Sequence, residues 1–150
     1  MAIAFFELEP TSLKDRKRLK TFIPSLFLKE GRELNNMNII FCSDDYLLEI
    51  NRLHLEHDFY TDIITFDLSE NKSDLITAEL YISIDRVKEN ALILKTSFYI
   101  ELHRVIFHGC LHLCGYTDKW KKDIGNMRAK EEESLSLYFS STNNSFSQKH

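Results

Sequence analysis

The sequence has no long hydrophobic run: nowhere do about 18 or more apolar residues follow one another, as a membrane-spanning helix requires. The first ten residues, MAIAFFELEP, lack the basic start, the long apolar stretch and the small-residue cleavage site of a secretory signal. No internal repeat, linker or low-complexity segment interrupts the domain. We therefore expect a soluble, cytoplasmic protein that has no membrane partner.

Cysteine and net positive charge are also scarce. Only Cys42, Cys110 and Cys114 are present, and this odd number suggests thiols in a reducing compartment rather than a disulfide framework. The net charge at pH 7 is −4, which excludes a general attraction to polyanions. Binding to a nucleic acid would therefore need a local basic surface.

Two short segments are basic enough to form such a surface, although each is ordinarily a solvated face. The segment KDRKRLK (14–20) carries five basic side chains and one acidic side chain. The segment DKWKKD (118–123), here called the lysine segment, carries Lys119, Lys121 and Lys122 directly after a candidate metal site that is described below.

The length and composition predict one domain. With 150 residues, of which 43% are hydrophobic, the chain can bury one substantial core and is too short for two ordinary domains. We expect this domain to cover residues 1–140. The remaining residues, 141–150, are polar, nearly uncharged and rich in serine and asparagine, so we expect them to form a flexible C-terminal tail.

Runs rich in apolar and β-branched residues predict four strands, at residues 3–9, 37–43, 61–69 and 78–84. The last two are joined by the short, turn-rich segment ENKSD (70–74), which favours antiparallel pairing. Helical spacing of apolar residues elsewhere predicts four or five helices. We therefore expect an α+β fold in which a mixed sheet of about four strands packs against four or five helices.

Residues that often cap helices mark the expected helix starts. In chain order, these are Thr11 or Ser12, Asp44 or Asp45, Asp85, Ser97 and Asp123. Within the first helical stretch, Pro24 should start a new turn or short helix.

Two histidines on the helix that opens at Ser97 are candidate metal ligands. Successive helical residues turn by about 100°, so His108 and His112 lie on one face, one turn apart, close enough to share an ion. Cys110 and Cys114 each follow a histidine by two residues. They therefore point to the opposite side and cannot join the histidines on one ion.

Gly115 and Asp118 extend this pair to the pattern H-x-x-x-H-x-x-G-x-x-D. Glycine adopts the left-handed conformation that ends a helix, which would let the chain double back and bring Asp118 to the two imidazoles. Three protein ligands leave a fourth position for water, the arrangement of a catalytic zinc, although Fe(II) or Ni(II) would also suit it. Such an ion activates water or polarises a carbonyl or phosphoryl oxygen, which indicates a hydrolase with the metal site on a helix and the following turn.

The position that would identify a zinc peptidase holds Gly109. In the H-E-x-x-H peptidases a glutamate at this position is the general base. Its absence disfavours peptide hydrolysis. A zinc metalloprotease stays an alternative because the histidine spacing matches the metzincin pattern.

The segment HGCLHLCGYTD (108–118) resembles the signature H-G-x-L-H-L-x-G-Y-D-H of the YbeY family, bacterial single-domain metal-dependent endoribonucleases that mature ribosomal RNA. The matching residues are His108, Gly109, Leu111, His112, Leu113, Gly115 and Tyr116. Further matches to the family are Asn51, Asp58, TDIITF (61–66), AELYISIDRV (78–87), Met127 and Glu131. The resemblance covers about residues 38–135.

This resemblance implies a single-strand-specific, zinc-dependent endoribonuclease that acts in late maturation and quality control of the small ribosomal subunit. Its partners would be ribosomal RNA and that subunit. One zinc ion would be held by His108, His112 and Asp118, and the lysine segment would contact the RNA backbone. The alternative is a non-catalytic, zinc-containing ribosome assembly factor.

The chain departs from the family pattern at two positions that bear on these alternatives. Asp118 stands where the family has its third histidine; a carboxylate is a competent zinc ligand, but its charge should make the bound water less acidic. Leu55 stands where the family has an arginine near the scissile phosphate. A leucine cannot make a bidentate phosphate contact, which favours the assembly-factor alternative.

His57 and Arg104 are the weak candidates for catalytic groups. His57 replaces a family lysine and could act as a cation or a general acid or base, although a surface histidine is the ordinary interpretation. Arg104 lies one turn before His108 on the same face and could contact phosphate, or simply face solvent.

Other side chains near the site have both a structural and a functional interpretation. Thr61 and Asp62 would lie near the cleft in the family's fold, or cap the start of a strand. His103 lies about 140° from His108 around the helix, which indicates packing or support rather than ligation. Tyr116 and Trp120 could stack on an unpaired RNA base or pack the turn.

Overall fold

The computed structural model describes residues 2–70 and 75–148, with side chains described as far as residue 140. The helices and strands, in chain order, are β1 (Ala2–Glu7), α1 (Arg16–Lys29), β2 (Glu33–Cys42), α2 (Asp44–Leu55), β3 (Ile63–Asp67), β4 (Leu75–Ser83), α3 (Ile84–Leu94), α4 (Phe98–Leu113) and α5 (Lys121–Gln148). The predicted α+β class, with a four-stranded mixed sheet, is confirmed. Over the described ranges, every helix is too short or too polar to span a membrane.

The sheet has the strand order β1-β2-β4-β3. β1, β2 and β4 run parallel, and β3 pairs antiparallel with β4, as the short connection predicts. Ile63 at the start of β3 lies opposite Ile82 near the end of β4. This pairing places the residues that precede β3 at one end of the sheet, next to the helices that follow β4.

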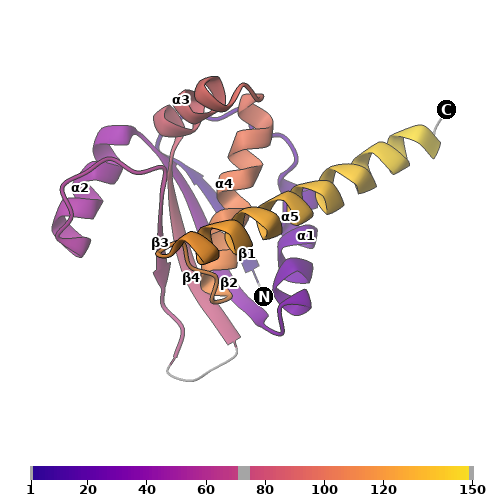
Figure 1. The fold of residues 1–150 in the computed structure, drawn as a ribbon, viewed down its shortest axis with the longest axis horizontal. Helices are drawn as coiled ribbons and strands as arrows, with labels where there is room; N and C mark the ends of the chain where they lie inside the picture. Colours follow the sequence, from indigo (N-terminus) through magenta and orange to yellow (C-terminus); the bar gives the residue numbers. More distant parts are fainter. Residues whose placement is uncertain (1, 71–74, 149–150) are drawn as a thin grey trace.

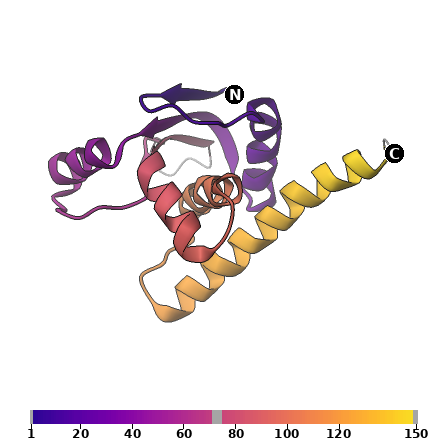
Figure 2. The ribbon, with the colours of Figure 1, turned by 90° about the horizontal axis from the view of Figure 1, so that it is seen from above.

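The main core lies between the sheet and a layer of helices. α4 occupies the centre of this layer and is packed between the sheet and α5, while α1 lies beside it (Figures 1 and 2). Because strand side chains alternate between faces, Ile63 joins the main core and Ile64 faces the opposite side, where it packs with Leu47 of α2. The two candidate histidines are carried on α4, the helix at the centre of this layer.

Serines cap three of the helices. Ser97 caps α4, as predicted, with its hydroxyl accepting a hydrogen bond from the Ile100 amide. The predicted caps of α2 and α3 are wrong, because Ser43 and Ser83 take the capping position in place of the aspartates. Asp44 and Asp85 instead occupy the first helical turn, where a carboxylate complements the helix dipole.

The first helix starts later than predicted. Neither Thr11 nor Ser12 caps it; α1 begins at Arg16, after Asp15. The carboxylate of Asp15 makes no capping bond, because it binds His103 of α4 at 2.7 Å. The contact spans 88 residues of sequence, so local pattern gave no sign of it.

Two helices run further than the sequence predicts. Pro24 lies inside α1, where the buried side chains of Ile23 and Phe27 keep the helix packed on the core although proline lacks an amide donor. α5 begins at Lys121 rather than Asp123, and its backbone continues through residues 141–148. The predicted tail lies partly outside the described residues, so the division at residue 140 stays a prediction.

Candidate metal centre

The end of α4 brings the three predicted ligands together. Gly115 has φ +105°, and the amides of Gly115 and Tyr116 bond back to the carbonyls of His112 and Leu111, each at 3.1 Å. The chain reverses there, so that Asp118 returns to the helix face. Its two carboxylate oxygens lie 3.7 Å from Nε2 of His108 and 3.9 Å from Nε2 of His112.

This donor set fits a divalent metal ion. One ligand atom from each of His108, His112 and Asp118 lies within 4.8 Å of the others. In tetrahedral zinc sites with bonds of about 2.0–2.1 Å, ligand atoms are roughly 3.3 Å apart, so a modest contraction would complete the geometry. Two imidazoles and one carboxylate are ligands that zinc accepts, and binding of the ion by these residues stays a prediction.

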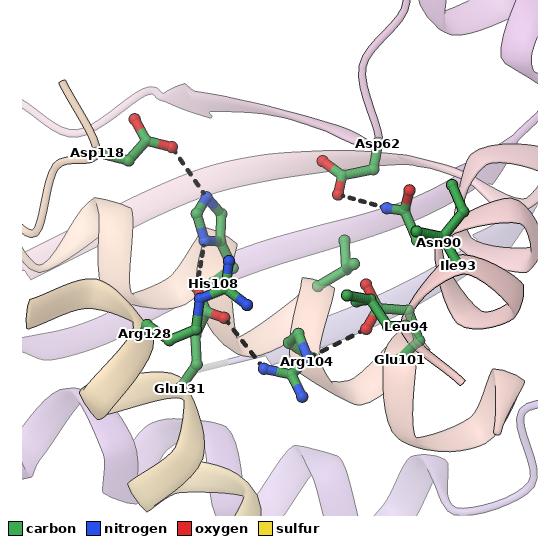
Figure 3. A pocket seen from close by; sticks show the side chains of 11 residues that line it. Asp62, Asn90, Ile93, Leu94, Glu101, Arg104, His108, Asp118, Arg128 and Glu131 are labelled. Carbon is green, nitrogen blue, oxygen red and sulfur yellow. Dashed lines mark hydrogen bonds and ion pairs between the residues drawn. The ribbon is translucent and has the colours of Figure 1, made fainter. Parts of the chain in front are cut away.

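Glu131 of α5 supports the site from behind. Its Oε2 lies 2.7 Å from Nδ1 of His108, and its side chain is buried. A dashed line marks this contact in Figure 3. A proton on Nδ1 donated to Glu131 leaves Nε2, the atom that faces Asp118, free to bind a metal. Burial lowers the pKa of His108, but the carboxylates of Glu131, Asp62 and Asp118 together outweigh this effect and raise it.

The sequence does not reveal this contact. Glu131 resembles a family position in the last helix, but nothing local links it to a histidine 23 residues earlier. Only the packing of α5 on α4 brings the two side chains together.

The two cysteines of α4 lie away from the ligands, as the helical geometry predicts. Cys110 is buried in the main core, and Cys114 packs against that core. Burial raises the pKa of the Cys110 thiol, and raises that of Cys114 to about 12. Both groups are therefore protonated thiols at neutral pH rather than metal-binding thiolates.

Gly109 faces the sheet and not the candidate ligands. A Cβ atom built there would lie 2.7 Å from Cδ1 of Ile63 and 3.2 Å from both Cδ atoms of Leu80. The position of the peptidase glutamate is thus a point of close approach between α4 and the sheet. No side chain here could act as a general base at the metal, which argues against the metalloprotease alternative.

Arg104 is held by carboxylates. Its guanidinium lies 3.1 Å from Glu101, 3.6 Å from Glu131 and 2.7 Å from Glu132. Burial lowers its pKa, but these carboxylates outweigh that effect and raise it. Arg104 therefore compensates the charge of the residues behind His108, and its candidate role as a phosphate ligand stays a prediction.

Asp62 faces His108 from the end of the sheet. It accepts a hydrogen bond from Nδ2 of Asn90 at 3.1 Å, and it lines a cavity of about 340 Å³ together with His108, Glu131 and Asp118 (Figure 3). Burial raises the pKa of its carboxyl group. Asp62 is thus a titratable group beside the candidate ligands, as the family's fold implies for this segment.

A second cavity, of about 360 Å³, also borders the ligands, and we call it the α2–β3 cleft. It is lined by Asn51, Leu55, His57, Phe59, Thr61, Asp62, Ile63, Ile64, Thr65, His108, His112 and Asp118. Leu55, at the family's arginine position, is 39% exposed and faces this cleft. His57 also lines the cleft, so the departures from the family pattern at Leu55 and His57 lie in the same cavity wall as the one at Asp118.

The remaining candidates line neither of these two cavities. His103 is fully buried and bonds the Tyr99 carbonyl and Asp15, which is the packed role predicted for it. Tyr116 donates its hydroxyl to Glu30 at 2.7 Å and therefore packs the turn. Trp120 is 72% exposed, and the cations of the lysine segment are also exposed.

Comparison with known proteins identifies the family. The family model described as "Endoribonuclease YbeY" matches residues 9–138. Proteins named Endoribonuclease YbeY from Cytophaga hutchinsonii and Flavobacterium psychrophilum are 50% and 49% identical, over 89% and 78% of this chain and 94% and 82% of theirs. The solution structure of TM1509 from Thermotoga maritima matches with a TM-score of 0.63 and 26% identity, over 96% of this chain and 93% of that one. The chain therefore belongs to the YbeY family.

Proposed function

We propose that the protein is a zinc-dependent endoribonuclease that cleaves single-stranded RNA during maturation and quality control of the small ribosomal subunit in the cytoplasm. Family membership and the names of the relatives support a nuclease that acts on RNA. The observation that carries the metal dependence is the convergence of His108, His112 and Asp118 between two cavities. Ribosomal RNA and the small subunit are the proposed partners.

His108, His112 and Asp118 would hold the ion, and Glu131 would keep His108 in the tautomer that binds through Nε2. Zinc in such a site supplies a Lewis acid for a phosphoryl oxygen and lowers the pKa of water. Asp118 adds a negative charge that moderates the electrophilicity of the site relative to three histidines.

Asp62 is the side chain best placed to exchange a proton near the scissile phosphate. Its carboxyl group lines the same cavity as His108 and Asp118, so it borders the space in which a substrate at the ion would lie. The bond from Asn90 fixes its orientation towards the cavity. His57 is exposed and Arg104 is paired with glutamates, so each is a weaker candidate for this role.

The test is cleavage of a labelled single-stranded RNA by protein purified without a polyhistidine tag. We expect cleavage that stops when a chelator is added and returns with zinc, and little cleavage of the same RNA in a duplex. His112→Ala, purified in parallel, should be inactive and controls for contaminating ribonucleases. Cleavage that persists in chelator, or in His112→Ala, would contradict the proposal.

Leu55 is the observation that favours a second candidate function, a non-catalytic assembly factor. Within the described part of the α2–β3 cleft, the lining residues include neither arginine nor lysine. A protein that binds ribosomal RNA through its zinc-stabilised turn without cutting it would bind RNA at the concentrations of the cleavage assay but would not cleave it. That result would favour the non-catalytic assembly factor.

A further inference from the structure

Two stacked rings form part of the wall of the α2–β3 cleft. The imidazole of His57 and the ring of Phe59 have centroids 5.1 Å apart and planes inclined by 22°. Both residues line the cavity that His108, His112 and Asp118 also line. Phe59 is nevertheless 55% exposed, so its ring offers apolar surface to a ligand in the cleft.

A buried asparagine holds the segment that carries these rings. Asn51 of α2 is 2% exposed, and its Nδ2 donates to the Phe59 carbonyl at 2.8 Å. Its backbone carbonyl accepts a bond from the His57 amide at 3.1 Å. Glu56, with φ +56°, turns the chain at the end of α2. Asn51 therefore holds the backbone of both His57 and Phe59, and this fixes the position of their rings at the cleft.

Away from the proposed zinc ion, the walls of the cleft favour contact with bases over contact with phosphates. Its described lining carries the carboxylates of Asp62 and Asp118 and no permanent cation. The chain as a whole has a net charge of −4. An RNA strand that enters here gains little from ion pairs with the walls, whereas the faces of unpaired bases stack well on aromatic rings.

We propose that Phe59, backed by His57, is a stacking platform for an unpaired base next to the cleaved linkage, and that it contributes to the selection of single strands. A base inside a duplex has both faces covered by its neighbours and cannot use such a platform. The inference rests on the proposed function, because the metal ligands define where the linkage lies. It makes Phe59 a specificity residue that binds substrate without taking part in bond cleavage.

The experiment compares Phe59→Ala, Phe59→Trp and Phe59→Tyr with the wild-type protein on a series of single-stranded RNAs, each with one abasic nucleotide. The matched control is Phe6→Ala, because Phe6 is 48% exposed on β1, at the opposite edge of the sheet. KM, kcat, zinc content and melting temperature are measured for each protein.

For unmodified RNA, we expect Phe59→Ala to raise KM roughly 10-fold with a small change in kcat, and Phe59→Trp and Phe59→Tyr to restore KM. Removal of one particular base should raise the KM of the wild type by a similar factor. It should leave the KM of Phe59→Ala unchanged, because the stacking of that base on Phe59 is already absent in this variant. Zinc content and melting temperature should stay at wild-type values. A merely structural role for Phe59 would not produce coupling to a single base.

A KM for Phe59→Ala within twofold of the wild type, or an equal response of both proteins at every abasic position, would overturn the inference. Failure of the wild type to cleave RNA would instead refute the proposed nuclease. In that case the same comparison is made with dissociation constants from fluorescence anisotropy, so the two failures are distinguishable.

Discussion

His108 has an acidic partner on each side of its ring. Asp118 lies 3.7 Å from Nε2 and Glu131 lies 2.7 Å from Nδ1. The two contacts have different chemical roles, because Nε2 faces the candidate ligand Asp118 and could bind a metal, whereas Nδ1 is bonded to Glu131. Glu131 is buried and lies 3.6 Å from Arg104, so its charge is compensated in the apolar surroundings of α4 and α5.

Glu131→Gln should weaken zinc binding by a factor of roughly 10 to 100, because the ring of His108 loses its charged acceptor while the three ligands remain. Competition with a chromophoric chelator measures this affinity. Glu132→Gln is the matched control, since Glu132 also binds Arg104 but does not contact His108. Equal zinc affinity in Glu131→Gln and the wild type would contradict the role given to Glu131.

The contact between α4 and the sheet fixes where the metal ligands stand. At Gly109 the helix approaches β3 and β4 so closely that no side chain fits without displacement of Ile63 and Leu80. Since His108 and His112 are on the same helix, this spacing also determines where they stand in the wall of the α2–β3 cleft. The glycine is thus a packing requirement of the element that carries the site.

Gly109→Glu, which would create the peptidase pattern H-E-x-x-H at residues 108–112, should unfold the protein rather than give it peptidase activity. A carboxylate at the helix–sheet contact would be buried without a partner, and the expected loss is about 4 kcal/mol or more of unfolding free energy. Thermal unfolding measures it. Gly125→Glu on α5 is the control, because no atom lies within 4 Å of a Cβ there, and it should melt close to the wild type. A stable Gly109→Glu protein that degrades casein would contradict both expectations.

Features that depend on local spacing could be predicted from the sequence, whereas contacts between distant segments could not. The predictable features are the four strands, the start of α4 and the cluster of His108, His112 and Asp118. The start of α1 and the support of His108 depend on side chains far along the chain, Asp15 with His103 and Glu131 with His108. Periodicity and capping patterns carry no information about such pairs.

At the scale of the whole molecule, Asp15 connects three helices. It lies before α1, binds His103 of α4 at 2.7 Å and accepts a hydrogen bond from the hydroxyl of Tyr138 on α5. Burial raises the pKa of Asp15, but the bonds and the charge from these partners outweigh it, and the pKa falls from 3.8 to about 2. The ionised carboxylate is therefore part of what holds the helical layer together.

This pKa predicts how stability changes with pH. Because the folded pKa lies below the unfolded value, the stabilisation is complete above about pH 4 and is lost as the pH falls towards 2. Asp15→Asn should cost about 3 kcal/mol at pH 6, and the difference from the wild type should shrink by about 2 kcal/mol at pH 2. Urea unfolding at the two pH values measures both quantities. A difference that does not depend on pH would contradict the assignment.

The convergence of His108, His112 and Asp118 is the central claim about this protein, and the zinc content of Asp118→Ala tests it most directly. Elemental analysis of protein without a polyhistidine tag should find roughly one zinc ion per chain in the wild type and far less in the folded variant. A variant that retains the wild-type zinc content would show that Asp118 is not a ligand and that the metal centre is built differently.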